Sequence, residues 1–294
     1  MAASAKIIRT PKQPARFPWP RLAAIVLFVV LLIWAIVELF PILFMFFNSV
    51  KTNAEIMGSP SGLPKVPRFL NYLEAWRGGN LGVNLARYFL NSVIVTSGTL
   101  VLLMFTGALA AYSLARYRFP GSALASNSLI WALAIPVHAT LIPVFHFLGS
   151  MGMRNNYFGL IGVYTAFWLP FTITVMIAYF ESFPRELEEA ARIDGCTDFS
   201  AFWRIVLPMS RGALASISII NVVGIWSELL FAYVLMNKPE VRTLPVGIVS
   251  FRGEYQVAWN LIFAGLSIAS IPTLLFFLIF QRQITKGMTM GALK

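Results

Sequence analysis

Apolar stretches with few or no charged residues alternate with polar segments along the chain. Six of these stretches can each hold about 20 helical residues, the length that crosses the hydrocarbon core of a bilayer. The pattern therefore predicts an all-α, polytopic membrane protein with six transmembrane helices. The spans are expected at about residues 22–47, 90–115, 124–147, 158–180, 212–236 and 259–281.

Composition supports a membrane protein, and the distribution of charge orients it. Of the 294 residues, 58% are hydrophobic and 12% charged, which is more apolar surface than a soluble domain could bury. The 23 Lys and Arg residues are spread over short segments between the spans and do not form the basic face that binds nucleic acid. Because 14 of them fall on one side of the expected topology and 9 on the other, the positive-inside rule predicts that both termini are cytoplasmic.

The segments outside the spans divide the chain into three parts. Residues 1–21 are basic and contain four prolines that oppose a helix, so a disordered cytoplasmic tail is expected there. Residues 22–281 form the six-helix transmembrane domain, and residues 282–294 a cytoplasmic C-terminal tail. Within the domain, residues 181–211 make a polar segment between the fourth and fifth spans, called the polar loop below.

Local signals in the polar loop predict two short helices joined by a turn. A proline and several glutamates favour a helix that begins near residues 182–184. Gly195 is a natural left-handed stop, and Thr197 or Asp198 can cap a second helix. Pro208 is expected to end that second helix at the preceding residue.

The polar loop also carries a fixed pattern, which reads Glu-Ala-Ala, three residues, Gly, nine residues, Ile, one residue and Leu-Pro. It resembles the EAA loop of the permease subunits of bacterial ABC importers at every fixed position. In that family the loop forms a cytoplasmic coupling helix that sits in a cleft of an ATPase subunit. The resemblance implies the same coupling role for Glu189, Ala190, Ala191, Gly195, Ile205, Leu207 and Pro208.

The resemblance extends over nearly the whole chain. The segment 243–247 resembles the fifth loop of the family. The segments 91–92, 111–116 and 119–121 look like its carbohydrate-uptake branch, which includes the G-type permease of maltose importers. The C-terminal end resembles a tail that reaches the ATPase interface in that branch. This implies an ATPase contact for Gly287, Thr289, Gly291 and Lys294.

Glu228 lies inside the fifth predicted span, where an ionised acidic side chain costs about 2.5 to 3.5 kcal/mol. Such a residue is expected to face protein or water. Glu228 and the nearby Trp226 are therefore candidates for the translocation path. A helix–helix hydrogen bond inside the bundle is an equal alternative for Glu228.

Residues for catalysis or metal binding are not evident in the sequence. It has no Gly-x-x-x-x-Gly-Lys-Ser/Thr phosphate loop, and His138 and His146 have a proline between them and no carboxylate nearby. We therefore expect no catalytic residue, no metal site and no cofactor in this chain. The resemblance implies that ATP and Mg²⁺ are bound by a separate ATPase subunit.

Together these observations predict a permease subunit of an ATP-driven ABC importer in the bacterial inner membrane. The resemblance implies alternating-access transport of a sugar or oligosaccharide that an external solute-binding protein delivers. Six spans enclose too little for a complete pathway of this family, so a second homologous permease is expected. The other expected partners are two copies of an ABC ATPase and the membrane lipid.

An ion-coupled secondary transporter is the alternative, with Glu38 or Glu228 as its proton or cation site. The polar loop favours the importer, because an ion-coupled carrier has no need of a cytoplasmic docking helix.

Overall fold

The computed structural model describes residues 19–78, 83–253 and 257–291, in which the regular elements are helices. Four of these helices are long and apolar enough to cross a membrane, or up to six if each of two bent pairs counts as one span. This confirms the all-α class. The chain divides into two units, Met1–Met45 and Phe46–Lys294, each described by itself.

The first unit consists, as far as it is described, of most of helix α1 (Trp19–Ser49). Its apolar side chains from Ile25 to Leu43 are exposed, and the Glu38 side chain is exposed as well. The helix contains the first predicted span but begins three residues earlier. Pro20 suits the first turn of a helix because its missing N–H has no partner there in any case. Residues 1–18 of the predicted tail lie outside the described residues.

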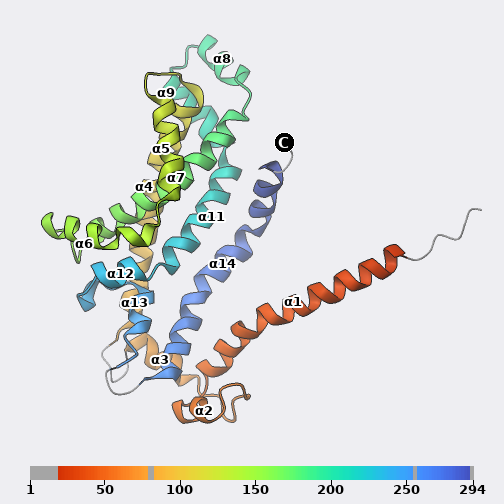
Figure 1. Cartoon of the computed structure of the whole chain (residues 1–294), viewed down its shortest axis with the longest axis vertical. Coiled ribbons are helices and arrows are strands. Elements are labelled where there is room, and N and C mark those ends of the chain that lie inside the picture. Colours follow the sequence, from red (N-terminus) through yellow and green to blue (C-terminus); the bar gives the residue numbers. More distant parts are fainter. Residues whose placement is uncertain (1–18, 79–82, 254–256, 292–294) are drawn as a thin grey trace, which may run out of the picture. The chain divides into compact units, whose positions relative to one another are not determined.

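In the second unit, α4 (Leu85–Arg116) and α7 (Tyr157–Glu181) pack along each other and hold the second and fourth predicted spans (Figure 1). Their common core contains Leu103, Leu160 and Tyr164, each at most 1% exposed. The helices come close at Gly107, where a Cβ atom would lie 3.0 Å from Thr172. This pair is the frame on which the other helices are placed.

Helices α11 (Arg211–Ser227) and α14 (Trp259–Gly291) pack against each other, and α11 also contacts α4. Asn221 on α11 donates a hydrogen bond to the Thr172 hydroxyl of α7 at 2.9 Å. The sixth predicted span, residues 259–281, lies at the start of α14, which continues to Gly291.

The third predicted span is broken, which corrects the expectation of a single transmembrane helix over residues 124–147. Two pieces, α5 (Ser122–Ala134) and a second made of η2 (Val137–Thr140) and α6 (Leu141–Ser150), meet at an angle of 92°. Pro136 causes the break, because it forces the preceding Ile135 into an extended conformation at ψ 123°. The 13 residues of α5 measure about 20 Å along the axis.

The fifth predicted span, residues 212–236, is also interrupted. Helix α11 ends at Ser227, Glu228 is extended at ψ 126°, and α12 (Leu230–Leu235) follows. The Glu228 carboxylate accepts hydrogen bonds from the backbone N–H groups of Phe231 at 2.9 Å and Ala232 at 3.2 Å. A carboxylate that caps the next helix in this way competes with continuation of the first.

One end of the second unit is built around Lys51, which is fully buried. Its Nζ donates to Asn48 Oδ1 and to the carbonyls of Ser59 and Pro60, each at 3.1 Å. Asn71 donates to the carbonyl of Lys51 at 2.8 Å. The helices at this end are α2 (Asn53–Gly58), α3 (Leu70–Arg77) and α13 (Leu244–Val249), and α8 (Glu186–Ile193) and α9 (Asp198–Ala201) of the polar loop lie at the opposite end (Figure 1). The short helix η4 (Pro239–Val241) lies beside the start of α4, where Arg87 Nε donates to the carbonyl of Glu240 at 3.0 Å.

Candidate functional site: the polar loop and its anchor

The polar loop forms two short helices that meet at a glycine, as its sequence predicts. Helix α8 (Glu186–Ile193) is followed by α9 (Asp198–Ala201), and Gly195 between them has φ 84°. Cys196 N–H donates to the carbonyl of Ala191 at 2.9 Å and closes the first helix. Thr197 caps the second, because its hydroxyl accepts from Ser200 N–H at 3.2 Å. Helix α8 begins two residues after Pro184.

The second helix continues past Pro208, which corrects the prediction that this proline ends it at Leu207. Helix α9 passes into the π-helix η3 (Phe202–Val206) and then into α10 (Leu207–Met209), and the chain bends by 74° before α11. A proline ring clashes with the carbonyl four residues earlier in an α-helix, and the wider π turn before Pro208 gives the ring room.

Helix α8 has an outer and an inner face. Glu189, Ala190 and Ile193 are exposed, with Ile193 at 86%, whereas Glu188 and Ala191 are buried. The Glu-Ala-Ala sequence is thus divided between the faces. The later motif residues, Ile205, Leu207 and Pro208, are half-buried. The outer face is therefore an acidic and apolar surface open to a partner.

The inner face of α8 is held to the end of α4 by buried charges. Arg116 Nε lies 2.8 Å from Glu188 Oε1, with the two side chains 5% and 7% exposed. Tyr112 on α4 donates its hydroxyl hydrogen to the other carboxylate oxygen at 2.9 Å. Removing one partner of such a buried pair costs about 3 to 5 kcal/mol, because the remaining charge is left without compensation.

Sequence reasoning missed Glu188, since the motif drew attention to Glu189. The available signal was the spacing of Glu188 and Ala191, three residues apart and so on the same side of a helix. The other member of the pair, Arg116, lies in the segment 111–116, which carries part of the family resemblance. No local sequence pattern links Arg116 to Glu188, because the two residues lie far apart in the chain.

Aromatic packing surrounds this anchor. The Tyr112 ring lies 4.9 Å from that of Phe202 and 5.9 Å from that of Phe180, measured between centroids. It therefore contacts the end of α7 and the π-helix. Within the loop, Arg192 pairs with Asp198 at 2.8 Å, and this hydrogen bond raises the pKa of Arg192. Both side chains of that pair are about half exposed, so it contributes little to stability.

The two candidates for a translocation path make internal hydrogen bonds. Trp226 Nε1 donates to the carbonyl of Ala269 on α14 at 3.0 Å. The Glu228 carboxylate, besides capping α12, accepts a hydrogen bond from the hydroxyl of Tyr164 on α7. Both contacts join helices of the bundle, which favours the helix–helix interpretation of Glu228.

The remaining candidates contribute less to a site. Gly287, Thr289 and Gly291 fall in the last turns of α14, whereas Lys294 and the side chain of Thr289 lie outside what the structure describes. His138 stacks on Phe231, and His146 lies edge-on to Phe145. Among the described residues, no group of three His, Cys, Asp or Glu side chains could hold a metal ion.

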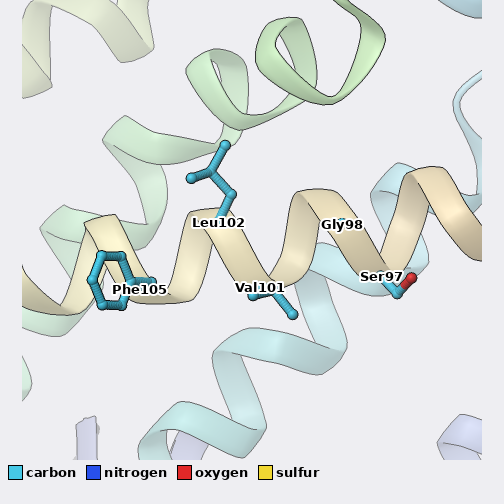
Figure 2. A pocket seen from close by; sticks show the side chains of 5 residues that line it. All are labelled: Ser97, Gly98, Val101, Leu102 and Phe105. Atoms are coloured by element: carbon cyan, nitrogen blue, oxygen red, sulfur yellow. The ribbon is translucent and has the colours of Figure 1, made fainter. Parts of the chain in front are cut away.

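A hollow on α4 is lined by Ser97, Gly98, Val101, Leu102 and Phe105, which all come from successive turns of one helix (Figure 2). Its one side-chain hydroxyl, on Ser97, already donates to the carbonyl of Val93 at 2.6 Å. Binding sites for small molecules normally gather several convergent polar groups. The polar loop therefore remains the candidate functional site.

Up to six apolar spans, together with a polar helix pair anchored at one end of the second unit, are the features of a multi-pass membrane protein. Residues 103–290 match the family described as "Binding-protein-dependent transport system inner membrane component". The chain belongs to this family.

Individual relatives agree with this assignment. The chain is 36% identical to the diacetylchitobiose uptake system permease protein NgcG of Streptomyces coelicolor, over 90% of this chain and 87% of that protein. It is 31% identical to the trehalose/maltose transport system permease protein MalG of Thermococcus litoralis, over 93% and 98%. A bacterial ABC transporter involved in the import of the acidic polysaccharide alginate shares the fold, with a TM-score of 0.80, 24% identity and coverage of 92% and 99%.

These matches confirm the prediction of an ABC importer permease and place the chain in the inner membrane. They give no support to an ion-coupled carrier that uses Glu38 or Glu228.

Proposed function

We propose that this chain is the non-catalytic permease subunit through which an ATP-driven importer moves a sugar or oligosaccharide by alternating access. The observation that carries the proposal is that the outer face of α8 is exposed, while the buried Glu188 on its inner face is held by Arg116 and Tyr112 of α4. A surface helix fixed in this manner can receive a push from a partner and pass it to the membrane helices. The sugar class rests on the relatives, whose names specify diacetylchitobiose and trehalose or maltose.

The proposal includes the partners that such a subunit needs. ATP and Mg²⁺ would be bound by an ATPase, present in two copies, with one copy on the outer face of α8. A homologous permease would complete the pathway, and a solute-binding protein would deliver the sugar at the end that holds Lys51. Support for the last partner comes from the family description, which names binding-protein-dependent transport.

The topology that this proposal requires places six spans in the membrane, with both termini and the polar loop in the cytoplasm. Cys196 is the only cysteine in the sequence and lies in the α8–α9 turn. An impermeant maleimide should therefore label it in inside-out vesicles but not in sealed right-side-out vesicles.

Ser61, exposed at the opposite end, supplies the control for the labelling experiment. In a Cys196→Ser background, Ser61→Cys should be labelled in right-side-out vesicles. Labelling of Cys196 in intact right-side-out vesicles would overturn the topology.

Glu189 gives a second test, directed at the ATPase contact. Its interaction with the α8 dipole is worth about 0.3 to 1 kcal/mol, too little to explain folding, so its larger use should be a contact with the partner. We expect the amount of ATPase that co-purifies with the permease pair to fall from wild type to Glu189→Gln and again to Glu189→Lys. Membrane insertion should stay equal, because the side chain is exposed.

Glu240→Lys is the matched control, since it makes the same charge reversal at an exposed position on η4, beside the start of α4, whereas α8 is held at the end of that helix. It should retain the ATPase as wild type does. Full retention by Glu189→Lys, or loss that follows poor insertion, would remove Glu189 from the docking surface.

A further inference from the structure

Two side chains on one side of α8 attach it to the rest of the unit. Of its side chains, Glu188 and Ala191 are buried, and the others are exposed. The linker before α8 is held at the same place, because Arg116 Nη2 donates to the carbonyl of Phe183 at 3.0 Å. Arg116 thus contacts both the helix and the segment leading into it.

The polar partner of α8 in this attachment is α4, although α8 follows α7 in the sequence. Arg116 is the last residue of α4, and Tyr112 lies one turn earlier on the same helix. Both direct polar atoms at the two oxygens of the Glu188 carboxylate, one at 2.8 Å and the other at 2.9 Å. A carboxylate held at both oxygens in a buried position has little freedom to turn.

The other ion pairs within the described part of the chain are exposed. Arg68–Glu74 and Arg192–Asp198 have side chains that are 33% to 50% exposed, at the same 2.8 Å separation. Water and salt can replace such contacts, whereas a buried pair resists separation because each charge would be left in an apolar setting. Among the ion pairs of the described residues, Arg116–Glu188 is therefore the one suited to carry force.

We propose that Arg116 and Glu188 are positioning residues for coupling: their buried ion pair, with the Tyr112 hydroxyl, makes α8 and α4 move as one body. A displacement of α8 is then passed directly to α4, and through its packing to α7. This inference rests on the proposed function, because it assumes that an ATPase displaces α8. It adds that α4 is the membrane helix that receives the movement, through the contacts of the Glu188 carboxylate with Arg116 and Tyr112.

The test uses the complete importer reconstituted in proteoliposomes, with two measurements on each variant. The first is the amount of ATPase retained by the permease pair, and the second is the amount of sugar taken up per ATP hydrolysed. Glu188→Gln keeps the size of the side chain but leaves Arg116 without a counter-charge. We expect retention close to wild type and a fall in uptake per ATP on the order of tenfold, within the usual range of coupling between sites.

Two further variants are expected to give intermediate values of sugar uptake per ATP. Tyr112→Phe removes one hydrogen bond and keeps the ring, so it should reduce uptake per ATP less than Glu188→Gln. The exchange Arg116→Glu with Glu188→Arg restores an ion pair and should recover part of the coupling. A purely structural role would lower the amount of complex and would not change the ratio of sugar to ATP.

Folding failure is addressed by the double variant Arg116→Met with Glu188→Leu, which leaves no unpaired buried charge and should insert normally. It should still couple poorly. The matched control is Glu74→Gln, the same change in the exposed pair Arg68–Glu74, and it should keep the wild-type ratio.

Wild-type uptake per ATP in Glu188→Gln or in the Met–Leu variant would overturn the inference. A wild-type permease pair that retains no ATPase would instead overturn the proposed function, so the two failures are distinguishable.

Discussion

Replacement of Gly195 by valine is expected to leave the chain inserted and abundant but to abolish sugar uptake by the assembled importer. Gly195 has φ 84°, a left-handed conformation that costs an L-residue about 1 to 2 kcal/mol and a β-branched one more. Nothing lies within 4 Å of a Cβ built at this position. The strain therefore acts on the backbone of the turn alone, and relief of it changes the angle between α8 and α9.

The measurement is uptake in proteoliposomes at matched permease content, together with ATPase retention. Gly121→Val is the matched control, since Gly121 has φ 89° and equally open surroundings but precedes α5. It carries the same strain and should keep the ATPase. Gly195→Asn should retain more uptake than Gly195→Val, because asparagine tolerates the left-handed region. Wild-type uptake by an inserted Gly195→Val chain would show that the turn geometry is dispensable.

The second large effect is expected at Gly247, where alanine should destabilise the end of the unit that holds α13. A Cβ at this position would lie 2.0 Å from Cδ2 of Tyr88. The Tyr88 ring is 3% exposed and packed in a buried cluster with Leu85 and Trp226, so it cannot move aside freely. Overpacking of this kind costs about 1 to 3 kcal/mol. The thermal midpoint of the purified protein in detergent should fall.

A rescue experiment tests the stated cause. Tyr88→Val removes the ring that the new Cβ would meet. Gly247→Ala should therefore lower the thermal midpoint much less in a Tyr88→Val background than in the wild-type background. Gly162→Ala is the control, because nothing lies within 4 Å of its Cβ position on α7. That change should be neutral or slightly stabilising, since alanine favours a helix. Equal thermal midpoints for Gly247→Ala and wild type would show that Tyr88 yields without cost.

Hydropathy predicted the spans that continuous helices form, at residues 22–47, 90–115, 158–180 and 259–281, because a long charge-free run leaves few other solutions in a membrane. It failed where a local contact overrides the pattern. Pro136 was visible in the sequence, but prolines are tolerated in membrane helices, so a 92° break could not be told from a kink. The break at Glu228 depends on a carboxylate that turns back to cap the next helix.

The same division holds in the candidate site. The Gly195 turn and the Thr197 cap are contacts between near neighbours, and residue type was sufficient to predict them. The anchor was not predictable in this way, since Tyr112 and Glu188 are 76 residues apart. The sequence also did not predict the π-helix before Pro208, because a single wide turn leaves no periodic signal.

The contacts of Lys51 should be less sensitive to dissolved salt than an exposed ion pair is. The acceptors of its Nζ are an amide oxygen and two backbone carbonyls, all neutral, and the ammonium group is fully buried. The contacts of the Lys51 ammonium group include no ion pair that dissolved salt could screen. The contacts that Lys51 makes with Asn48, Ser59 and Pro60 should therefore persist as the salt concentration varies. This suits the end proposed to face away from the cytoplasm, where the solute-binding protein would dock.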